Sequence, residues 1–109
     1  MAYKKVTKTN KELEAVKHLY PALKRYEIEA RLICSEPFIS LKHRYNRYLG
    51  STHWTVTRHK KRYSVGNKCE KCSSTRELHV HHINYKLLYD VTMEDLMVLC
   101  EECHKKEHS

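Results

Sequence analysis

Hydrophobic residues recur with two different periods along the chain. In the first half they fall at three- and four-residue intervals, which is the period of a helix. This pattern predicts helices over residues 11–19 and 21–33, with Pro21 in the first turn of the second helix, where its missing N–H needs no partner. The apolar positions are Leu13, Val16, Tyr20 and Leu23, followed by Ile28 and Leu32. We therefore expect the N-terminal part of the chain to be helical.

Two further segments are expected to be helical before the period changes. Glu36-Pro37 should interrupt the preceding helix, because the residue before a proline avoids the α region. A weaker helical pattern covers residues 38–49. Ser51 is a suitable N-cap for another helix that ends near Tyr63.

The C-terminal part has the alternation of apolar and polar residues that is typical of strands. Residues 76–83 alternate in this way, and a second apolar run covers residues 96–99. A polar loop over residues 84–94 would join the two strands, and Cys100 would open a short terminal helix. The order strand, loop, strand, helix after several N-terminal helices predicts an α+β protein.

The composition is that of one small domain without a membrane segment. The chain has 109 residues, of which 40% are hydrophobic, so the core is modest and a structural metal would support it. There is no apolar run of about 18 residues and no apolar stretch after the N-terminal lysines, so neither a membrane span nor a signal peptide is expected. Four of the five cysteines form two C-x2-C pairs, which favours a reducing, cytoplasmic location over a disulfide framework.

Positive charge is concentrated in the first part of the chain. Residues 1–64 carry 15 Lys/Arg against 5 Asp/Glu, a surplus of +10, whereas residues 65–109 carry 6 against 8, which gives −2. A polyanion such as DNA would therefore be held largely by the first part. The alternative is that these lysine-rich helices are simply a solvated surface.

Cations and aromatic residues are interleaved between residues 44 and 62. Arginine and lysine can contact phosphates, and aromatic rings can stack on bases. Trp54 is the only tryptophan, and we expect it in the core of a small domain rather than against a base. The residues expected near phosphate are Arg58, Lys60, Lys61 and Arg62.

Two cysteine pairs, Cys69-Glu-Lys-Cys72 and Cys100-Glu-Glu-Cys103, have the spacing of a structural zinc site. Each pair presents both sulfurs to one ion, and two pairs complete a tetrahedral Zn²⁺ site. A two-cysteine, two-histidine finger made from the first pair and the C-terminal histidines would need a spacer of 31 residues instead of about a dozen. It would also leave the second cysteine pair unused, so the four-cysteine site is favoured.

The histidines near these cysteines need other roles. His81 and His82 are neighbours on a strand and should point in opposite directions, which predicts separate roles. His104 and His108 lie four apart on a helix and share one face, the usual way for a helix to offer two imidazoles to a metal. No role is assigned to the other five histidines, His18, His43, His53, His59 and His79.

These motifs resemble those of the HNH endonucleases, a family with the ββα-metal fold, in the subgroup with a four-cysteine zinc. The matching residues are Cys69-x2-Cys72, Leu78-His-Val-His-His-Ile83, Asp95-Leu96 and Leu99-Cys-x2-Cys-His104-x3-His108, with Tyr48-Leu-Gly-Ser51-x2-Trp54-x3-Arg58 upstream. The resemblance implies an HNH domain over residues 48–109, preceded by a basic helical extension over residues 1–47.

The resemblance also implies roles for individual residues. His82 would be the general base that takes a proton from the attacking water. His81 and His104 would bind one catalytic divalent cation, and His108 matches a third imidazole ligand of some members. Asp95 stands where the family usually has asparagine, and it would either orient His82 or add charge near the metal. The catalytic cation could be Mg²⁺, Mn²⁺, Ni²⁺ or Zn²⁺, and the structural ion would be Zn²⁺.

The function implied is that of a metal-dependent endonuclease that hydrolyses phosphodiester bonds of DNA and leaves 5′-phosphate and 3′-hydroxyl ends. The alternatives are a non-catalytic zinc-knuckle protein that binds nucleic acid and an adaptor whose basic face meets an acidic partner. Residues 1–47 contain no identifiable DNA-reading fold. The oligomeric state is open as well, and a homodimer or a larger phage or bacterial assembly would both suit such a chain.

Overall fold

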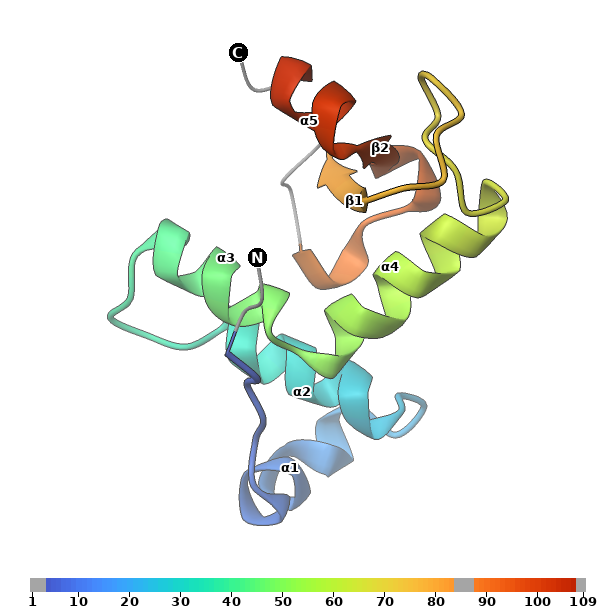
Figure 1. The fold of residues 1–109 in the computed structure, drawn as a ribbon. Helices are drawn as coiled ribbons and strands as arrows, with labels where there is room; N and C mark the ends of the chain where they lie inside the picture. The colour runs from blue at the N-terminus through green and yellow to red at the C-terminus, as the bar shows by residue number, and fades with distance from the viewer. Residues whose placement is uncertain (1–3, 84–87, 108–109) are drawn as a thin grey trace. The chain divides into compact units, whose positions relative to one another are not determined.

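The computed structural model describes residues 4–83 and 88–107, whose helices and strands are drawn in Figure 1. The chain divides into two compact units. The first unit ends at Val56 and the second begins at Thr57, so helix α4 (Thr52–Ser64) contains the boundary. The sequence predicts a different division, after residue 47, between a basic helical extension and an HNH domain. That division by function stays a prediction. Within the described ranges, no helix is long and apolar enough to cross a membrane.

Helices build the first unit, and side chains cap their ends. At the start of α1, Thr9 Oγ1 accepts a hydrogen bond from the Glu12 backbone N–H at 3.2 Å, and the Glu12 carboxylate accepts one from the Thr9 N–H at 2.8 Å. This reciprocal capping box satisfies two N–H groups that the helix itself cannot pair. The elements are α1 (Asn10–Val16), the 3-10 turn η1 (Lys17–Leu19), α2 (Arg25–Cys34), α3 (Leu41–Leu49) and the start of α4.

The second helix begins later than the sequence pattern predicts. Pro21 lies in a turn, and α2 starts four residues after it, so the placement of Pro21 in a first helical turn was wrong. The physical reason is a local cap, in which the Lys24 N–H donates to Glu27 Oε1 at 3.1 Å and fixes the helix start. The cap predicted for α4 is confirmed, because Ser51 Oγ accepts from the Trp54 N–H at 3.2 Å.

Side-chain packing between α2 and α3 forms the core of the first unit. Its most completely buried apolar side chains are Ala30, Ile33 and Tyr48. Trp54 is also buried, as predicted. The extended start of the chain joins this unit through a hydrogen bond from Val6 N to Gly50 O at 2.9 Å. A Cβ at Gly50 would lie 2.1 Å from the Lys4 carbonyl oxygen, so only glycine permits this approach.

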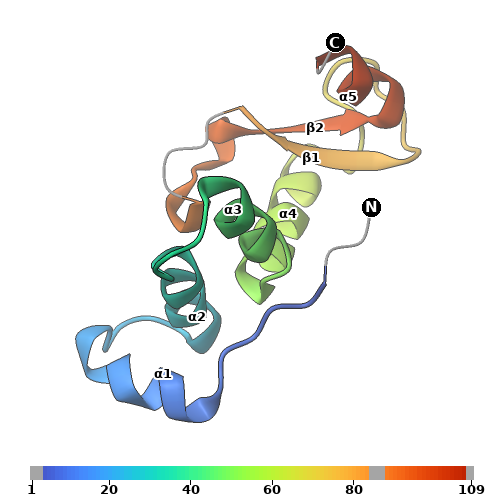
Figure 2. The ribbon, with the colours of Figure 1, turned by 90° about the vertical axis from the view of Figure 1, so that its left-hand side faces the viewer.

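The second unit contains a two-stranded antiparallel sheet followed by a helix (Figure 2). Strand β1 (Leu78–His82) pairs with β2 (Leu96–Cys100), and His82 lies opposite Leu96. Helix α5 (Glu101–Glu107) follows β2 directly and packs against both strands. The strand–strand–helix order and the preceding helices confirm the predicted α+β class.

Turns connect α4 to this sheet and one strand to the other. Gly66 and Asn67 have φ angles of 75° and 54°, the left-handed conformation that these two residue types tolerate best. The 3-10 turns η2 (Leu88–Asp90) and η3 (Met93–Asp95) precede β2. Residues 84–87 of the predicted loop lie outside the described residues.

Besides the buried Leu96 and Val98, the second unit has a small hydrophobic cluster that is rich in sulfur. The buried members of this cluster are Cys69, Leu99 and Cys100, against which Leu78, Met97 and Cys103 pack. Three of these six side chains are cysteines. Hydrophobic burial alone is therefore limited in this unit, and its stability should depend on what the thiols bind.

Candidate metal and catalytic site

The four paired cysteines come together at one end of the hairpin. Cys69 and Cys72 lie in the turn before β1, Cys100 ends β2, and Cys103 lies in α5. Their four sulfur atoms all lie within 4.8 Å of one another. The fold thus brings together two C-x2-C motifs that lie 31 positions apart in the chain, as the sequence predicted.

The spacing of these sulfurs suits a tetrahedral metal ion. Four sulfurs at 2.3 Å from a central zinc would be separated by roughly 3.8 Å from one another. The Cys72 Sγ and Cys100 Sγ atoms are 3.5 Å apart, close to that value. The four thiols could therefore hold a metal ion without a change of fold.

The ionisation of the thiols points in the same direction. Burial alone would raise the pKa of Cys69, but backbone N–H groups, that of Cys100 first, lower this pKa to about 6. Hydrogen bonding to Cys100 and burial raise the pKa of Cys103 to about 12. One thiol thus ionises readily while a neighbour resists, because like charges at this spacing oppose each other. A bound cation would remove this opposition and favour the thiolate form throughout.

A buried lysine and a glutamate fasten the first cysteine turn to the rest of the unit. The Glu70 N–H donates to the Val98 carbonyl oxygen at 2.9 Å, and Glu70 Oε2 accepts from the Val98 N–H at 2.6 Å. Lys61 Nζ lies 3.8 Å from the same carboxylate and donates to the Met93 carbonyl oxygen at 2.9 Å. Both residues support the site, and the sequence did not single them out for this role.

Lys61 therefore differs from the other basic residues predicted to lie near phosphate. Its residue surface is only 7% exposed, and its ammonium group is used inside the unit. Lys60 is exposed, whereas Arg58 and Arg62 are partly buried. An Arg62 guanidinium nitrogen lies 3.2 Å from His59 Nδ1.

Three imidazoles gather where β1 meets α5. The ring centroids of His81 and His104 are 5.3 Å apart in an edge-on arrangement, and those of His79 and His104 are 5.2 Å apart and stacked. His79 and His81 are two residues apart on one strand and share its face. The sequence analysis gave His79 no role, although the alternation of side chains along the strand could have placed it beside His81 in this histidine cluster. His108 lies outside the described residues.

His82 occupies a different environment from its neighbour. It is 2% exposed, whereas His81 is partly exposed. Burial lowers the pKa of His82 to about 4, and His81 adds to this effect, while the negative charge of Asp95 opposes it. The imidazole of His82 is therefore neutral at pH 7 and able to accept a proton.

Asp95 lies beside His82 in the fold and is held in place by Thr92. The Asp95 Oδ2 atom accepts hydrogen bonds from the Thr92 N–H at 3.0 Å and from Thr92 Oγ1 at 3.2 Å. The Ile83 N–H donates to the Asp95 carbonyl oxygen at 2.8 Å, which joins the residue after His82 to the residue before β2. The carboxylate is thus fixed close enough to His82 to influence its charge.

Comparison with protein families places these residues in a known group. The model of the HNH endonuclease family matches residues 69–109, the segment that contains the four cysteines, the strand histidines and α5. This segment is an HNH domain. Comparison with curated proteins and with solved structures gave no match. The family resemblance inferred from the sequence is therefore confirmed for the segment that carries the site residues.

Proposed function

We propose that this protein is a metal-dependent endonuclease that hydrolyses phosphodiester bonds of DNA. The observation that carries the proposal is the arrangement of histidines within the HNH domain. A buried, neutral His82 sits on a strand whose neighbouring residue, His81, lies next to His104 of the following helix. One imidazole is thus separated from the pair that could bind a cation.

In this proposal His82 is the general base. Its neutral imidazole takes a proton from the water that attacks phosphorus, a role that proteins assign most often to histidine. Asp95 supports this step because its negative charge favours the imidazolium that forms when the proton arrives. The hydrogen bonds from Thr92 keep the carboxylate in position for it.

His81 and His104 are the residues that would hold the catalytic cation, with His108 as a further candidate ligand. The two imidazoles come from adjacent elements with their rings 5.3 Å apart, which fits a shared ion. A bound divalent cation would stabilise negative charge on the scissile phosphate and on the leaving oxygen. Imidazole ligands suit Ni²⁺ and Zn²⁺, whereas Mg²⁺ and Mn²⁺ would depend more on oxygen ligands from water and the phosphate, and all four ions are candidates.

The four-cysteine cluster would hold a structural Zn²⁺. Four sulfur ligands close the coordination sphere, so this ion has no open position for water or substrate. Its expected contribution is to folding, because it ties the first turn to β2 and α5. Thiols reserved for a metal also support a reducing location, and we place the protein in the cytoplasm.

Phosphates of the DNA would be contacted by exposed cations on α4. Lys60 is exposed, and Arg58 and Arg62 are partly exposed on the same helix. Lys61 is left out of this role because it is buried and bonded to the Met93 carbonyl oxygen. Each phosphate contact should lower the slope of log affinity against log salt by about 0.9 on duplex DNA.

The test is cleavage of supercoiled plasmid by the zinc-loaded full chain, with Mg²⁺, Mn²⁺ or Ni²⁺ added. We expect metal-dependent nicking or linearisation, with ends that DNA ligase can seal because they carry 5′-phosphates. His82→Ala should lower the rate by about 10²–10⁴-fold, whereas His18→Ala, an exposed histidine on η1, should cut like the wild type.

Two outcomes would count against the proposal. If His82→Ala cuts at the wild-type rate, the assignment of the base is wrong. If the folded, zinc-bound wild type cuts with none of the three metals but still binds DNA, the non-catalytic zinc-knuckle alternative is favoured.

A further inference from the structure

Helix α3 presents an outer surface that the nuclease site does not use. Its inner face is buried through Tyr48 and Leu49, whereas Lys42, His43 and Asn46 on its first turns are exposed. The segment Leu41–Leu49 has no acidic residue. The exposed side chains are thus hydrogen-bond donors without a neighbouring carboxylate on their own helix.

The turn before α3 adds apolar side chains to this surface. Phe38 is 103% exposed and Leu41 is 80% exposed, so the side chains of both residues stand in solvent. Phe38 also has a φ angle of 61°, a region that a bulky residue rarely occupies. A strained backbone that holds an aromatic ring out in water is costly for the fold alone and suits a surface that contacts a ligand.

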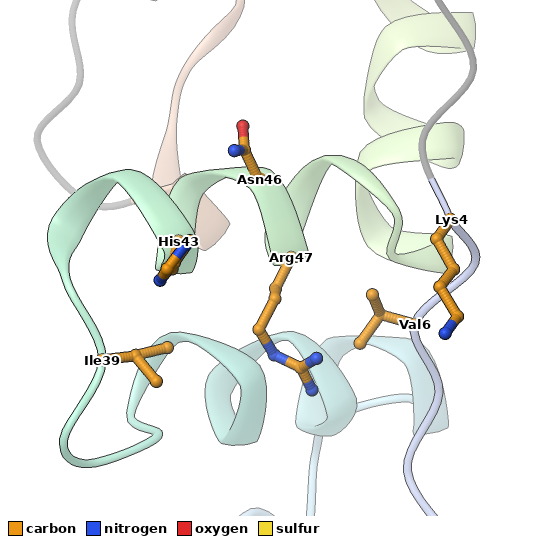
Figure 3. Close-up of a pocket in the computed structure, with 6 residues that line it drawn as sticks. All are labelled: Lys4, Val6, Ile39, His43, Asn46 and Arg47. Carbon is orange, nitrogen blue, oxygen red and sulfur yellow. The ribbon is translucent and has the colours of Figure 1, made fainter.

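A cavity of about 340 Å³ lies beside these residues (Figure 3). His43 and Arg47 point toward the side of α3 that faces α2, whereas Asn46 points away from it. Arg47 Nε donates to Glu36 Oε1 at 2.7 Å, and Lys8 Nζ lies 3.8 Å from the same oxygen, so two cations meet one carboxylate. The residues that line the cavity are Lys4, Val6, Ile39, His43, Asn46 and Arg47. Its charged lining residues are all cationic, like the outer face of α3.

We propose that the α3 surface, defined as Phe38, Leu41, Lys42 and Asn46, binds duplex DNA in the major groove and reads bases there. The groove is about 12 Å wide and admits a helix, and residues near the N-terminus of such a helix reach the base edges. Lysine can donate to guanine, asparagine can bond adenine through two atoms, and apolar side chains contact the methyl group of thymine. This surface offers all three kinds of contact within one helix start and the turn before it.

The chemistry favours DNA over other partners. A protein partner would need an acidic group to match Lys42, whereas every duplex supplies regular negative charge beside the bases. Double-stranded RNA is a poor fit, because its major groove is too narrow and deep for side chains to read. The inference goes beyond the proposed function, because the residues that would cut are in the other unit and the binding can be measured without cutting.

The experiment uses the zinc-loaded full chain with His82→Ala as the background, so that DNA stays intact. Binding sites are selected from a random duplex library, and affinity for the selected duplex is measured by fluorescence anisotropy at several salt concentrations. We expect a preferred sequence and a dissociation constant that rises steeply with salt. An RNA duplex of the same sequence should bind at least about tenfold more weakly.

Four added variants separate base reading from general charge. Asn46→Ala should relax the preference at one base position by about 5–150-fold, the range of one bidentate contact. Lys42→Ala should weaken binding by at least about fivefold, whereas Lys11→Ala, which removes the same charge from exposed α1, should change it less than twofold. Phe38→Gly should weaken binding several-fold while the melting temperature stays equal or rises, because glycine adopts a φ of 61° without strain.

The failures of the two proposals are distinguishable. Metal-dependent plasmid cleavage by the wild type tests the nuclease, whereas these binding measurements test the α3 surface in a background that does not cut. Selection without a preferred sequence would overturn base reading by α3. Affinities for the Lys42, Asn46 and Phe38 variants that equal that of Lys11→Ala would overturn the surface itself, as would equal binding of DNA and RNA duplexes.

Discussion

The two units of this chain are stabilised in different ways. In the first, helices capped by their own side chains pack around fully buried Ala30, Ile33 and Tyr48. In the second, half of the central cluster is cysteine, and a short hairpin and a seven-residue helix surround it. The first unit is stabilised by an ordinary helical core. The second is expected to be stabilised mainly by its metal site, with a smaller hydrophobic contribution.

This difference explains where function can be read from the sequence. A metal site requires particular residue types at short, fixed spacings, so the C-x2-C pairs and the histidines of the HNH domain can be recognised from the sequence. A helical core demands only apolar residues at a helical period, which many folds share. The first unit therefore reveals its fold class from the sequence but not its partner.

The largest expected effect that separates the units is loss of the structural metal. Structural zinc supplies about 10–16 kcal/mol to small zinc domains, so Cys72→Ser should leave residues 57–109 sensitive to proteolysis while helices of the first unit persist. Cys34→Ser, which changes the cysteine outside the cluster, should retain zinc and resist the protease. Limited proteolysis and zinc analysis check both variants, and equal sensitivity would remove the distinction between the units.

The converse experiment creates a cavity in the helical core of the first unit. Ile33 is fully buried, so Ile33→Ala should lower the free energy of unfolding of the first unit by about 2–5 kcal/mol. Zinc content and the protease resistance of the HNH domain should stay as in the wild type. Thermal unfolding followed by circular dichroism measures the first effect, and simultaneous loss of zinc would show that the units depend on each other.

A smaller effect is expected at the buried lysine of α4. Lys61→Met should cost about 1.5–3 kcal/mol, because it removes the charged hydrogen bond to the Met93 carbonyl oxygen and leaves Glu70 without this cation. Lys60→Met on the exposed side of the helix should change stability by less than about 0.5 kcal/mol. For DNA affinity the order should reverse, with Lys60→Met the weaker binder. Denaturant unfolding and DNA titration of both variants test this exchange of roles.

The smallest expected effect concerns His79. Its ring stacks on His104, and a stacked pair contributes about 0.5–1.5 kcal/mol, so His79→Ala should weaken Mn²⁺ binding by about 2–10-fold. His79→Phe, which keeps a ring in place, should recover most of the affinity, and His104→Ala should lose far more. Calorimetric titration of zinc-loaded protein with Mn²⁺ provides the comparison. Equal losses for His79→Ala and His79→Phe would mean that the nitrogen atoms matter more than the stacking.

Several features of the fold follow from local sequence chemistry. The cap at Ser51, the burial of Trp54 and the order of the two strands and the terminal helix were all predicted, because each depends on nearby residues. The convergence of the four cysteines was predicted too, because the metal chemistry requires it. The prediction for Pro21 was wrong, because a cap formed by Glu27 competed with the general preference of proline for a first turn.

The features that the sequence left out depend on contacts between distant segments. The burial of Lys61 requires Met93, 32 residues further along the chain, and composition alone places this lysine in a basic run. The role of His79 depends on how α5 packs on β1, although its shared face with His81 could be read from the alternation. Long-range packing therefore decides which of several similar side chains serve the site.

The most direct test of the central proposal is the cleavage rate of His82→Ala measured together with its zinc content, Mn²⁺ affinity and DNA affinity. If His82 is the base, cutting falls by about 10²–10⁴-fold while the other three quantities stay at wild-type values. Wild-type cutting by this variant, or loss of metal and DNA binding together with cutting, would contradict the separation of base and metal ligands proposed for this HNH domain.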